Sequence, residues 1–169
     1  MAAQAIRDQD TYDRETIIQE AEAIFGKGAS GLGGLIERAF MDYGQPSGFI
    51  AGEEAAGALT VGVRYGHGTL KLRNGQQRKV YWQGPSIGFD VGGNGSKAFV
   101  LVYNINNIED VFKRYPGVDS SLYFVGGLGM NYNRRAGAVL APIRLGLGWR
   151  QGAAVGYMKV TAFRSFNPF

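Results

Sequence analysis

The sequence predicts a mainly β protein: a small Gly-rich antiparallel β-barrel of about eight strands, with two N-terminal helices and one short helix between strands. From about residue 48 to residue 163, glycine alternates with apolar residues, as in Ile87-Gly88-Phe89 and Val155-Gly156-Tyr157. Alternation with a period of two is typical of strands that bury one face. Glycine at alternate positions removes bulk from one face, so the sheet can bend sharply.

Length and composition indicate one folded domain. The chain has 169 residues, of which 45% are hydrophobic, 19% are charged and 27 are glycine. We expect a flexible segment over residues 1–12 and a single domain over 13–169, with helices in 13–44 and the barrel in 48–163. There is no cysteine, which excludes disulfides and cysteine-based metal sites.

The formal charge of +4 is unevenly placed. Residues 1–25 hold six acids and two bases, a net −4, and the rest of the chain holds eight acids and sixteen bases, a net +8. The basic barrel could attract the acidic N-terminal segment or an anionic partner such as lipid, lipopolysaccharide or nucleic acid. Alternatively, these charges only keep the outward strand faces soluble.

Two helices are predicted before the barrel. Asp13 is a suitable N-cap for the first, whose apolar residues fall on one face and which ends at Gly26. The second is expected from about Ser30 to Tyr43, followed by Gly44 and Pro46.

Strands with closely spaced turn signals follow. Asn74-Gly75 is a strong hairpin signal, and Asn107 is a suitable cap for a short helix over 107–114. We place the strands near 48–53, 57–65, 68–73, 77–83, 86–92, 97–103, 121–131, 136–149 and 153–163.

No motif supports catalysis, a cofactor or a metal centre. His67 is the only histidine, so a catalytic triad or a histidine-based metal site has few partners to draw on. Gly95-Ser96-Lys97 resembles a phosphate loop superficially, but Lys97 opens an apolar strand rather than a helix. A hydrolase that uses Asp90 or Glu54 near His67 is kept as a remote alternative. We predict no enzyme activity and no cofactor.

Basic residues are the main candidates for binding. Lys71 and Arg73 share one face of a predicted strand, and Leu70 and Leu72 share the other. The candidate contacts for an anion or a lipid are Lys71, Arg73, Arg78, Lys79, Trp82, Arg144 and Arg150. The competing interpretation is an exposed sheet edge kept soluble by Lys and Arg. Nucleic acid is not expected, because aromatic and basic residues do not form a known binding module.

The central sequence resembles a known family. The stretches that carry the likeness are residues 57–68, which run from Gly57 to Gly68, residues 82–93, which include Trp82 and Pro85, and residues 99–104. They resemble the EipA family of bacterial envelope-integrity proteins. The resemblance implies a soluble periplasmic protein of Gram-negative bacteria, made with a cleaved leader and with Ala2–Ala5 at the mature end. It also implies a small barrel and a role in envelope stress resistance linked to the lipopolysaccharide layer, with no catalytic residues.

More distantly, the same stretch is similar to the SYLF lipid-binding domain, which binds acidic phospholipids partly through a basic N-terminal helix. Here the first predicted helix is acidic, with Glu15, Glu20 and Glu22 against Arg14. A contact with acidic lipid would therefore come from the basic barrel faces.

The leading hypothesis is a non-enzymatic periplasmic protein that supports envelope integrity. The alternative is a binder of anionic lipid or lipopolysaccharide, peripheral at most because no apolar run is long enough to cross a membrane. An envelope protein is a further candidate partner.

Overall fold

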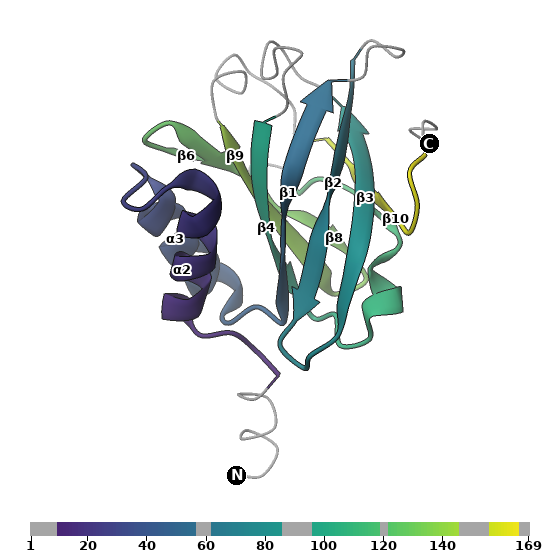
Figure 1. Ribbon diagram of the computed structural model, residues 1–169, viewed down its shortest axis with the longest axis horizontal. Coiled ribbons are helices and arrows are strands. Elements are labelled where there is room, and N and C mark those ends of the chain that lie inside the picture. Colours follow the sequence, from purple (N-terminus) through teal and green to yellow (C-terminus); the bar gives the residue numbers. More distant parts are fainter. Residues whose placement is uncertain (1–9, 57–61, 86–95, 119–121, 146–155, 166–169) are drawn as a thin grey trace.

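The computed structural model describes residues 10–56, 62–85, 96–118, 122–145 and 156–165, and it confirms a mainly β fold with a curled antiparallel sheet (Figure 1). Two helices come first, α2 (Arg14–Phe25) and α3 (Leu32–Tyr43). The elements that follow are β1 (Gly48–Ala56), β2 (Val63–Leu72), β3 (Gln77–Pro85), β4 (Ser96–Tyr103), the 3₁₀ helix η1 (Ile108–Val111), β5 (Arg114–Tyr115), β6 (Tyr123–Val125), β7 (Leu128–Met130), β8 (Asn133–Arg135), β9 (Ala138–Leu145) and β10 (Met158–Thr161).

The described strands form one sheet whose order is β5-β10-β3-β2-β1-β4-β9-β7-β6, and β8 also pairs with β9. The residues after β5 meet β8, because Arg134 N donates to Pro116 O and Val118 N donates to Tyr132 O, both at 2.9 Å. The curled sheet thus returns to itself through β5, β10, β3, β2, β1, β4, β9 and β8. This ring matches the prediction of a small barrel, and β7 and β6 extend from β9 toward α3.

The inner face of the barrel is filled by apolar side chains at alternate strand positions. Trp82 and Leu70 are among the largest of these, and η1 adds Ile108 and Val111. The strand residues in this inner core are Ile50, Leu70, Leu72, Val80, Trp82, Ala98, Val100, Val102, Tyr115, Ala138, Leu140, Met158 and Val160. The barrel interior is therefore a packed core over the described residues.

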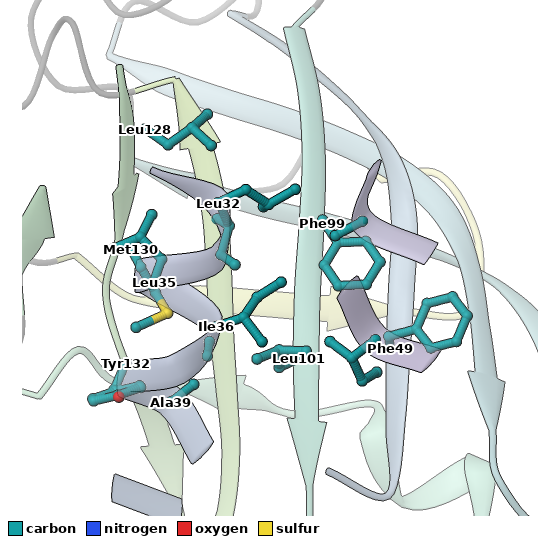
Figure 2. Close-up of a cluster of buried hydrophobic side chains, with 14 of the residues drawn as sticks. Leu32, Leu35, Ile36, Ala39, Phe49, Phe99, Leu101, Leu128, Met130 and Tyr132 are labelled. Atoms are coloured by element: carbon teal, nitrogen blue, oxygen red, sulfur yellow. The ribbon is translucent and has the colours of Figure 1, made fainter. Parts of the chain in front are cut away.

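The helices cover the outer face of β1, β4, β7 and β9 (Figure 2). Leu35 and Ile36 of α3 pack with Leu101 of β4, and the rings of Phe49 and Phe99 stack with centroids 5.3 Å apart. This second core exists because the amphipathic helices need a partner for their apolar stripes. The helices pack on the barrel and do not plug it.

Local signals position the helices. Asp13 caps α2 as predicted, since its side chain accepts a hydrogen bond from Thr16 N at 3.0 Å. Just before it, Tyr12 N donates to Pro46 O at 2.9 Å, which ties residue 12 to the start of the barrel. The second helix begins at Leu32, two residues later than expected. Gly31 precedes it with φ of 90°, and a side chain there would overlap the Val125 carbonyl.

Several predicted strand boundaries were wrong. Strand β2 runs without a break through Gly66-His67-Gly68, where two strands were expected. The predicted strand 121–131 is a hairpin, β6–β7, and 136–149 is preceded by a separate strand, β8. A turn at Ala136 and Gly137, with φ of 51° and 90°, separates β8 from β9. The expected strand 86–92 and the positions Gly88 and 146–149 lie outside the described residues.

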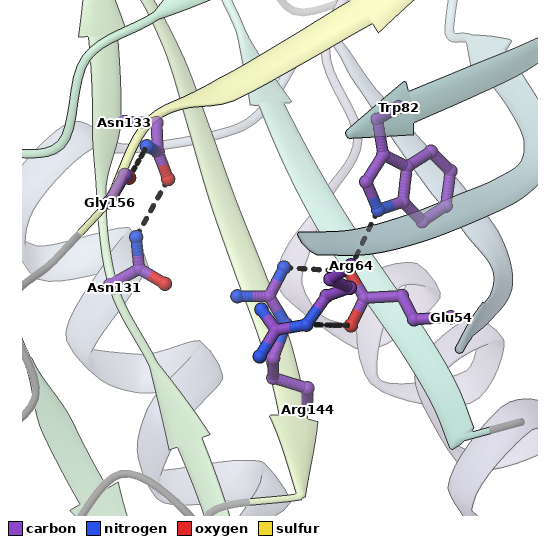
Figure 3. A network of polar contacts seen from close by, with 7 residues as sticks. All are labelled: Glu54, Arg64, Trp82, Asn131, Asn133, Arg144 and Gly156. Carbon is purple, nitrogen blue, oxygen red and sulfur yellow. Dashed lines mark hydrogen bonds and ion pairs between the residues drawn. The ribbon is translucent and has the colours of Figure 1, made fainter. Parts of the chain in front are cut away.

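Buried asparagines hold the seam of the barrel (Figure 3). Asn133 Nδ2 donates to Tyr115 O at 3.1 Å and to Gly156 O at 2.7 Å. Its own Oδ1 accepts from Asn131 Nδ2 at 2.7 Å. The side chain thus links β8 to β5 and to the chain that enters β10, where short strands provide few ladder hydrogen bonds.

Gly66 gives a stability test of this packing. It lies directly opposite Trp82 in the β2–β3 register, and an added methyl group would overlap the indole ring. We expect Gly66→Ala to lower the free energy of unfolding by about 1–3 kcal/mol through overpacking. The measurement is urea denaturation followed by circular dichroism.

The matched control is Gly33→Ala in α3, where an added methyl group has open space around it. Helix propensity favours alanine, so this variant should be as stable as the wild type or more stable by up to about 1 kcal/mol. Equal stability of the two variants would contradict the packing of Trp82 against Gly66.

Candidate functional site

A buried charge cluster, here called the Glu54 cluster, lies inside the barrel (Figure 3). The Glu54 carboxylate accepts two hydrogen bonds of 2.8 Å from Nε and Nη2 of Arg144. Trp82 Nε1 donates to Glu54 Oε2 at 2.7 Å, and Arg64 Nε lies 3.8 Å from Oε1. One carboxylate therefore joins side chains from β1, β2, β3 and β9.

Strand alternation and glycine place these residues. Glu54 has the same parity in β1 as the inward-facing Ile50, and Arg144 has the same parity in β9 as Leu140. Gly66 leaves room for the Trp82 indole, which reaches across to the carboxylate. The fork of the Arg144 guanidinium matches both carboxylate oxygens, a geometry that lysine cannot reproduce.

The cluster keeps Glu54 ionised. Burial alone would raise the pKa of this carboxyl, but the charges of Arg144 and Arg64, together with hydrogen bonds from Arg144 and Trp82, hold it below its ordinary value. Burial and the nearby charge of Arg144 lower the pKa of Arg64 to about 10, against the opposing effect of Glu54. Glu54 is thus committed to structural ion pairing and is a poor proton donor at neutral pH.

A pocket of about 190 Å³ lies over the same strands, lined by residues of β1, β2, β3 and the chain after β10. The outward-facing side chains of the lining are Glu53, Tyr65, His67, Tyr81 and Gln83. Arg164 and Ser165 lie at the edge. The neighbouring residues of the strands that also line it are Glu54, Ala55, Gly66 and Trp82. We call it the tyrosine pocket. It combines two aromatic rings with several hydrogen-bonding groups.

The sequence-predicted candidate contacts are divided among different places. Lys71, Arg73 and Lys79 are exposed, and Leu70 and Leu72 face inward as expected. Lys71 and Arg73 line a wide groove between the start of α2 and the β2–β3 hairpin, together with Gln45 and Gln76.

Trp82 and Arg144, which were predicted to contact an anion or a lipid, are buried instead. Their relative exposures are 1% and 8%, because both face the barrel interior and bind Glu54. Arg78 pairs with Glu109 and lies over the Phe112 ring at 4.8 Å, so it braces η1. Arg150 lies outside the described residues.

Sequence reasoning missed the joint role of Glu54 and Arg64. The available signal was an acid at an inward-facing position of an apolar strand, where burial requires a partner. His67 faces outward, opposite Glu53 in the β1–β2 register, so it lies on the other side of the sheet from the Glu54 carboxylate. Asp90, the other carboxylate considered for hydrolysis, lies outside the described residues.

The described residues contain neither a metal-binding cluster nor a membrane-spanning helix. Within those ranges, no group of three or more His, Cys, Asp or Glu side chains has the arrangement to hold a metal ion. Nor does any helix there have the length and apolar character needed to cross a bilayer.

Comparisons with known proteins give a consistent assignment. Residues 10–169 match the EipA family, described as envelope integrity protein A. A crystal structure of an uncharacterized β-barrel-like protein from Brucella abortus is 42% identical in sequence and has a TM-score of 0.87. That alignment covers 95% of this chain and 99% of the Brucella chain. No curated protein matches the sequence.

The Glu54 cluster predicts a large, specific effect of one substitution. Glu54→Gln leaves two buried guanidiniums facing a neutral amide, so we expect the free energy of unfolding to fall by about 3–5 kcal/mol. Glu53→Gln on the same strand is the control, because its ion pair with Lys97 at 3.1 Å is exposed and should contribute at most about 1 kcal/mol. Urea denaturation at pH 7 measures both, and equal losses would contradict the proposed importance of the buried pair.

The pH dependence provides a second readout of the same variants. The pKa of Glu54 is lower in the folded protein than its ordinary value of 4.5, so the unfolded chain takes up the proton first as the pH falls. The stabilisation is therefore complete above about pH 4.5 and is lost on acidification. Glu54→Gln should flatten this loss relative to Glu53→Gln, and parallel pH profiles would argue against it.

Proposed function

The chain belongs to the EipA family of envelope integrity proteins, and from this premise we propose that it is a non-enzymatic periplasmic protein that supports envelope integrity and stress resistance in a Gram-negative bacterium. The family match carries the proposal, because it spans both helices and every described strand. The envelope role itself is what family membership indicates.

We infer the absence of enzyme activity from the contacts of the buried polar side chains. The Glu54 carboxylate, the buried acid of the barrel core, is engaged by Arg144 and Trp82 at hydrogen-bond distances. A carboxylate held below its ordinary pKa by two guanidiniums is a weak general acid and a weak general base at neutral pH. A structural or binding role therefore fits these residues better than hydrolysis.

The filled interior points to the outside of the barrel for contacts with other molecules. Apolar side chains and the Glu54 cluster occupy the described inner face. The helices cover the outer face of β1, β4, β7 and β9, while β2, β3 and β10 contribute no residue to that helix-covered core. A partner in the envelope would meet this second outer face, which carries Lys71, Lys79 and Lys159 at outward positions.

A contact with anionic lipid or lipopolysaccharide is the second candidate. Lys71 and Arg73 are exposed and line the groove beside α2, and Lys79 lies on the same sheet face as Lys71. Positive side chains near an anionic headgroup contribute attraction that salt screens. This observation favours the basic surface of β2 and β3.

Deletion of the gene tests the envelope role. We expect the deletion strain to lose viability in detergent and in the presence of envelope-targeting antibiotics, and the wild-type gene to restore it. Cell fractionation of a tagged protein should recover it with the periplasm. Unchanged survival of the deletion strain under every challenge would refute the envelope role, and recovery in the cytoplasm would refute the location.

Liposome co-sedimentation tests the lipid alternative. If the basic surface binds, the protein should sediment with anionic liposomes at low salt and less at high salt, and Lys71→Glu with Arg73→Glu should abolish sedimentation. The double variant Lys27→Glu with Arg134→Glu is the control, since it makes the same charge change at exposed positions elsewhere. Equal effects of the two double variants would show that only net charge matters.

A further inference from the structure

We propose that the tyrosine pocket binds a sugar ring of a glycan. The pocket lies over β1, β2 and β3 and is bounded by Arg164 and Ser165 after β10. Its volume of about 190 Å³ suits one ring of a longer chain better than a large ligand. The residues that line it supply the two kinds of contact that a sugar needs.

Four side chains form the floor in a regular arrangement. In the β2–β3 register Tyr65 lies opposite Gln83, and His67 lies opposite Tyr81. All four occupy the outward parity, because Leu70 and Leu72 of β2 and Val80 and Trp82 of β3 face inward. The two tyrosines are therefore diagonal neighbours, each beside a planar polar side chain.

The aromatic rings fit the apolar face of a pyranose. The C–H groups on that face are slightly positive and favour the electron-rich face of an aromatic ring. Tyr65 and Tyr81 are both half-buried, so they are fixed in place while part of each ring stays accessible. Their hydroxyl groups add hydrogen-bonding capacity at the edge of the contact.

The polar groups fit sugar hydroxyls. Glu53 and His67 are opposite each other in the β1–β2 register, and together they offer acceptors and a donor at one side of the pocket. Gln83 is 1% exposed, and its Oε1 has no hydrogen-bond partner among the described residues, while its Nε2 reaches Thr161 Oγ1 only at 3.5 Å. Because that oxygen has almost no accessible surface, a ligand hydroxyl would donate to it only after the Gln83 side chain turns toward the pocket.

Other ligand classes fit less well. The Glu54 charge faces the barrel interior and is paired there, and Glu53 and Arg164 bring opposite charges to the lining, so the pocket has no net positive charge to attract a phosphate or another anion. Ala55 is the aliphatic residue of the lining, whereas an acyl chain needs a largely aliphatic surface. A sugar ring combines an apolar face with neutral hydroxyls and meets both constraints.

Arg164 shapes the rim. Its guanidinium lies over the Tyr81 ring, 5.6 Å from the ring centre, and its side chain is exposed, so it can swing aside when a sugar ring stacks on that face of the tyrosine. Together with Ser165 it brings the chain after β10 to the edge of the pocket. A sugar would thus contact residues far apart in the sequence.

Saturation-transfer difference NMR on the full chain tests the proposal with two probes, a tetramer of N-acetylglucosamine and maltotetraose. We expect at least one probe to show saturable transfer to its ring protons. Tyr81→Ala should weaken binding by about tenfold or more, whereas Tyr81→Phe, which keeps the ring face, should bind within about threefold of the wild type. Phe124→Ala is the control, because it removes an exposed aromatic ring on β6 outside the pocket.

Each alternative outcome overturns the assignment. These outcomes are no transfer to either probe, equal loss in Phe124→Ala, and displacement of the probe by inorganic phosphate. Thermal unfolding of each variant verifies that the fold is intact. The choice of sugars rests on the proposed envelope role. Binding is measured on purified protein, however, so the sugar-binding proposal can fail while the deletion phenotype is observed, or the reverse.

Discussion

The ionised Glu54 carboxylate is the constraint around which the barrel is arranged. A carboxylate inside a packed core is tolerated only where charges and hydrogen bonds compensate for the water it has lost. Arg144 supplies two hydrogen bonds and Trp82 a third. These partners come from β9 and β3, on either side of β1 in the strand order. A shift of any of these strands by one residue would turn a partner outward and leave the charge unpaired.

Glycine makes this arrangement possible by giving room on the inner face. Gly52 and Gly68 lie directly opposite each other in β1 and β2, and a side chain on either would overlap the backbone of the other strand. Gly66, two residues away, gives its space to the Trp82 indole. The strands can therefore approach closely and curl while one large side chain spans the gap. Glycine thus allows the sheet to bend, and the Trp82 and Arg144 side chains fill the space inside the barrel.

The sequence was a good guide to local structure and a poor guide to contacts across the barrel. Capping by Asp13, the Asn74-Gly75 turn and the inward faces of Leu70 and Leu72 follow from local rules and were predicted. The uninterrupted β2 was missed because glycine flanking His67 is a turn signal in isolation. The Glu54–Arg144 pair joins residues 90 positions apart. Only the strand order decides that a basic residue faces a buried acid rather than solvent, so Arg144 could not be distinguished from Lys71.

The two faces of the sheet consequently have different roles, one in stability and one in contacts with other molecules. On the inner face, Arg144 and Trp82 compensate the buried Glu54 carboxylate, which leaves little freedom for a ligand. On the outer face, the helices cover one half and bury Phe49 and Phe99, while β2 and β3 keep tyrosine, glutamine and lysine side chains at outward positions. Because the barrel is stabilised by its interior and by the helix-covered face, these outward side chains can be substituted at small cost in stability. Recognition in the envelope is therefore best sought on β2 and β3, where the fold itself makes the fewest demands.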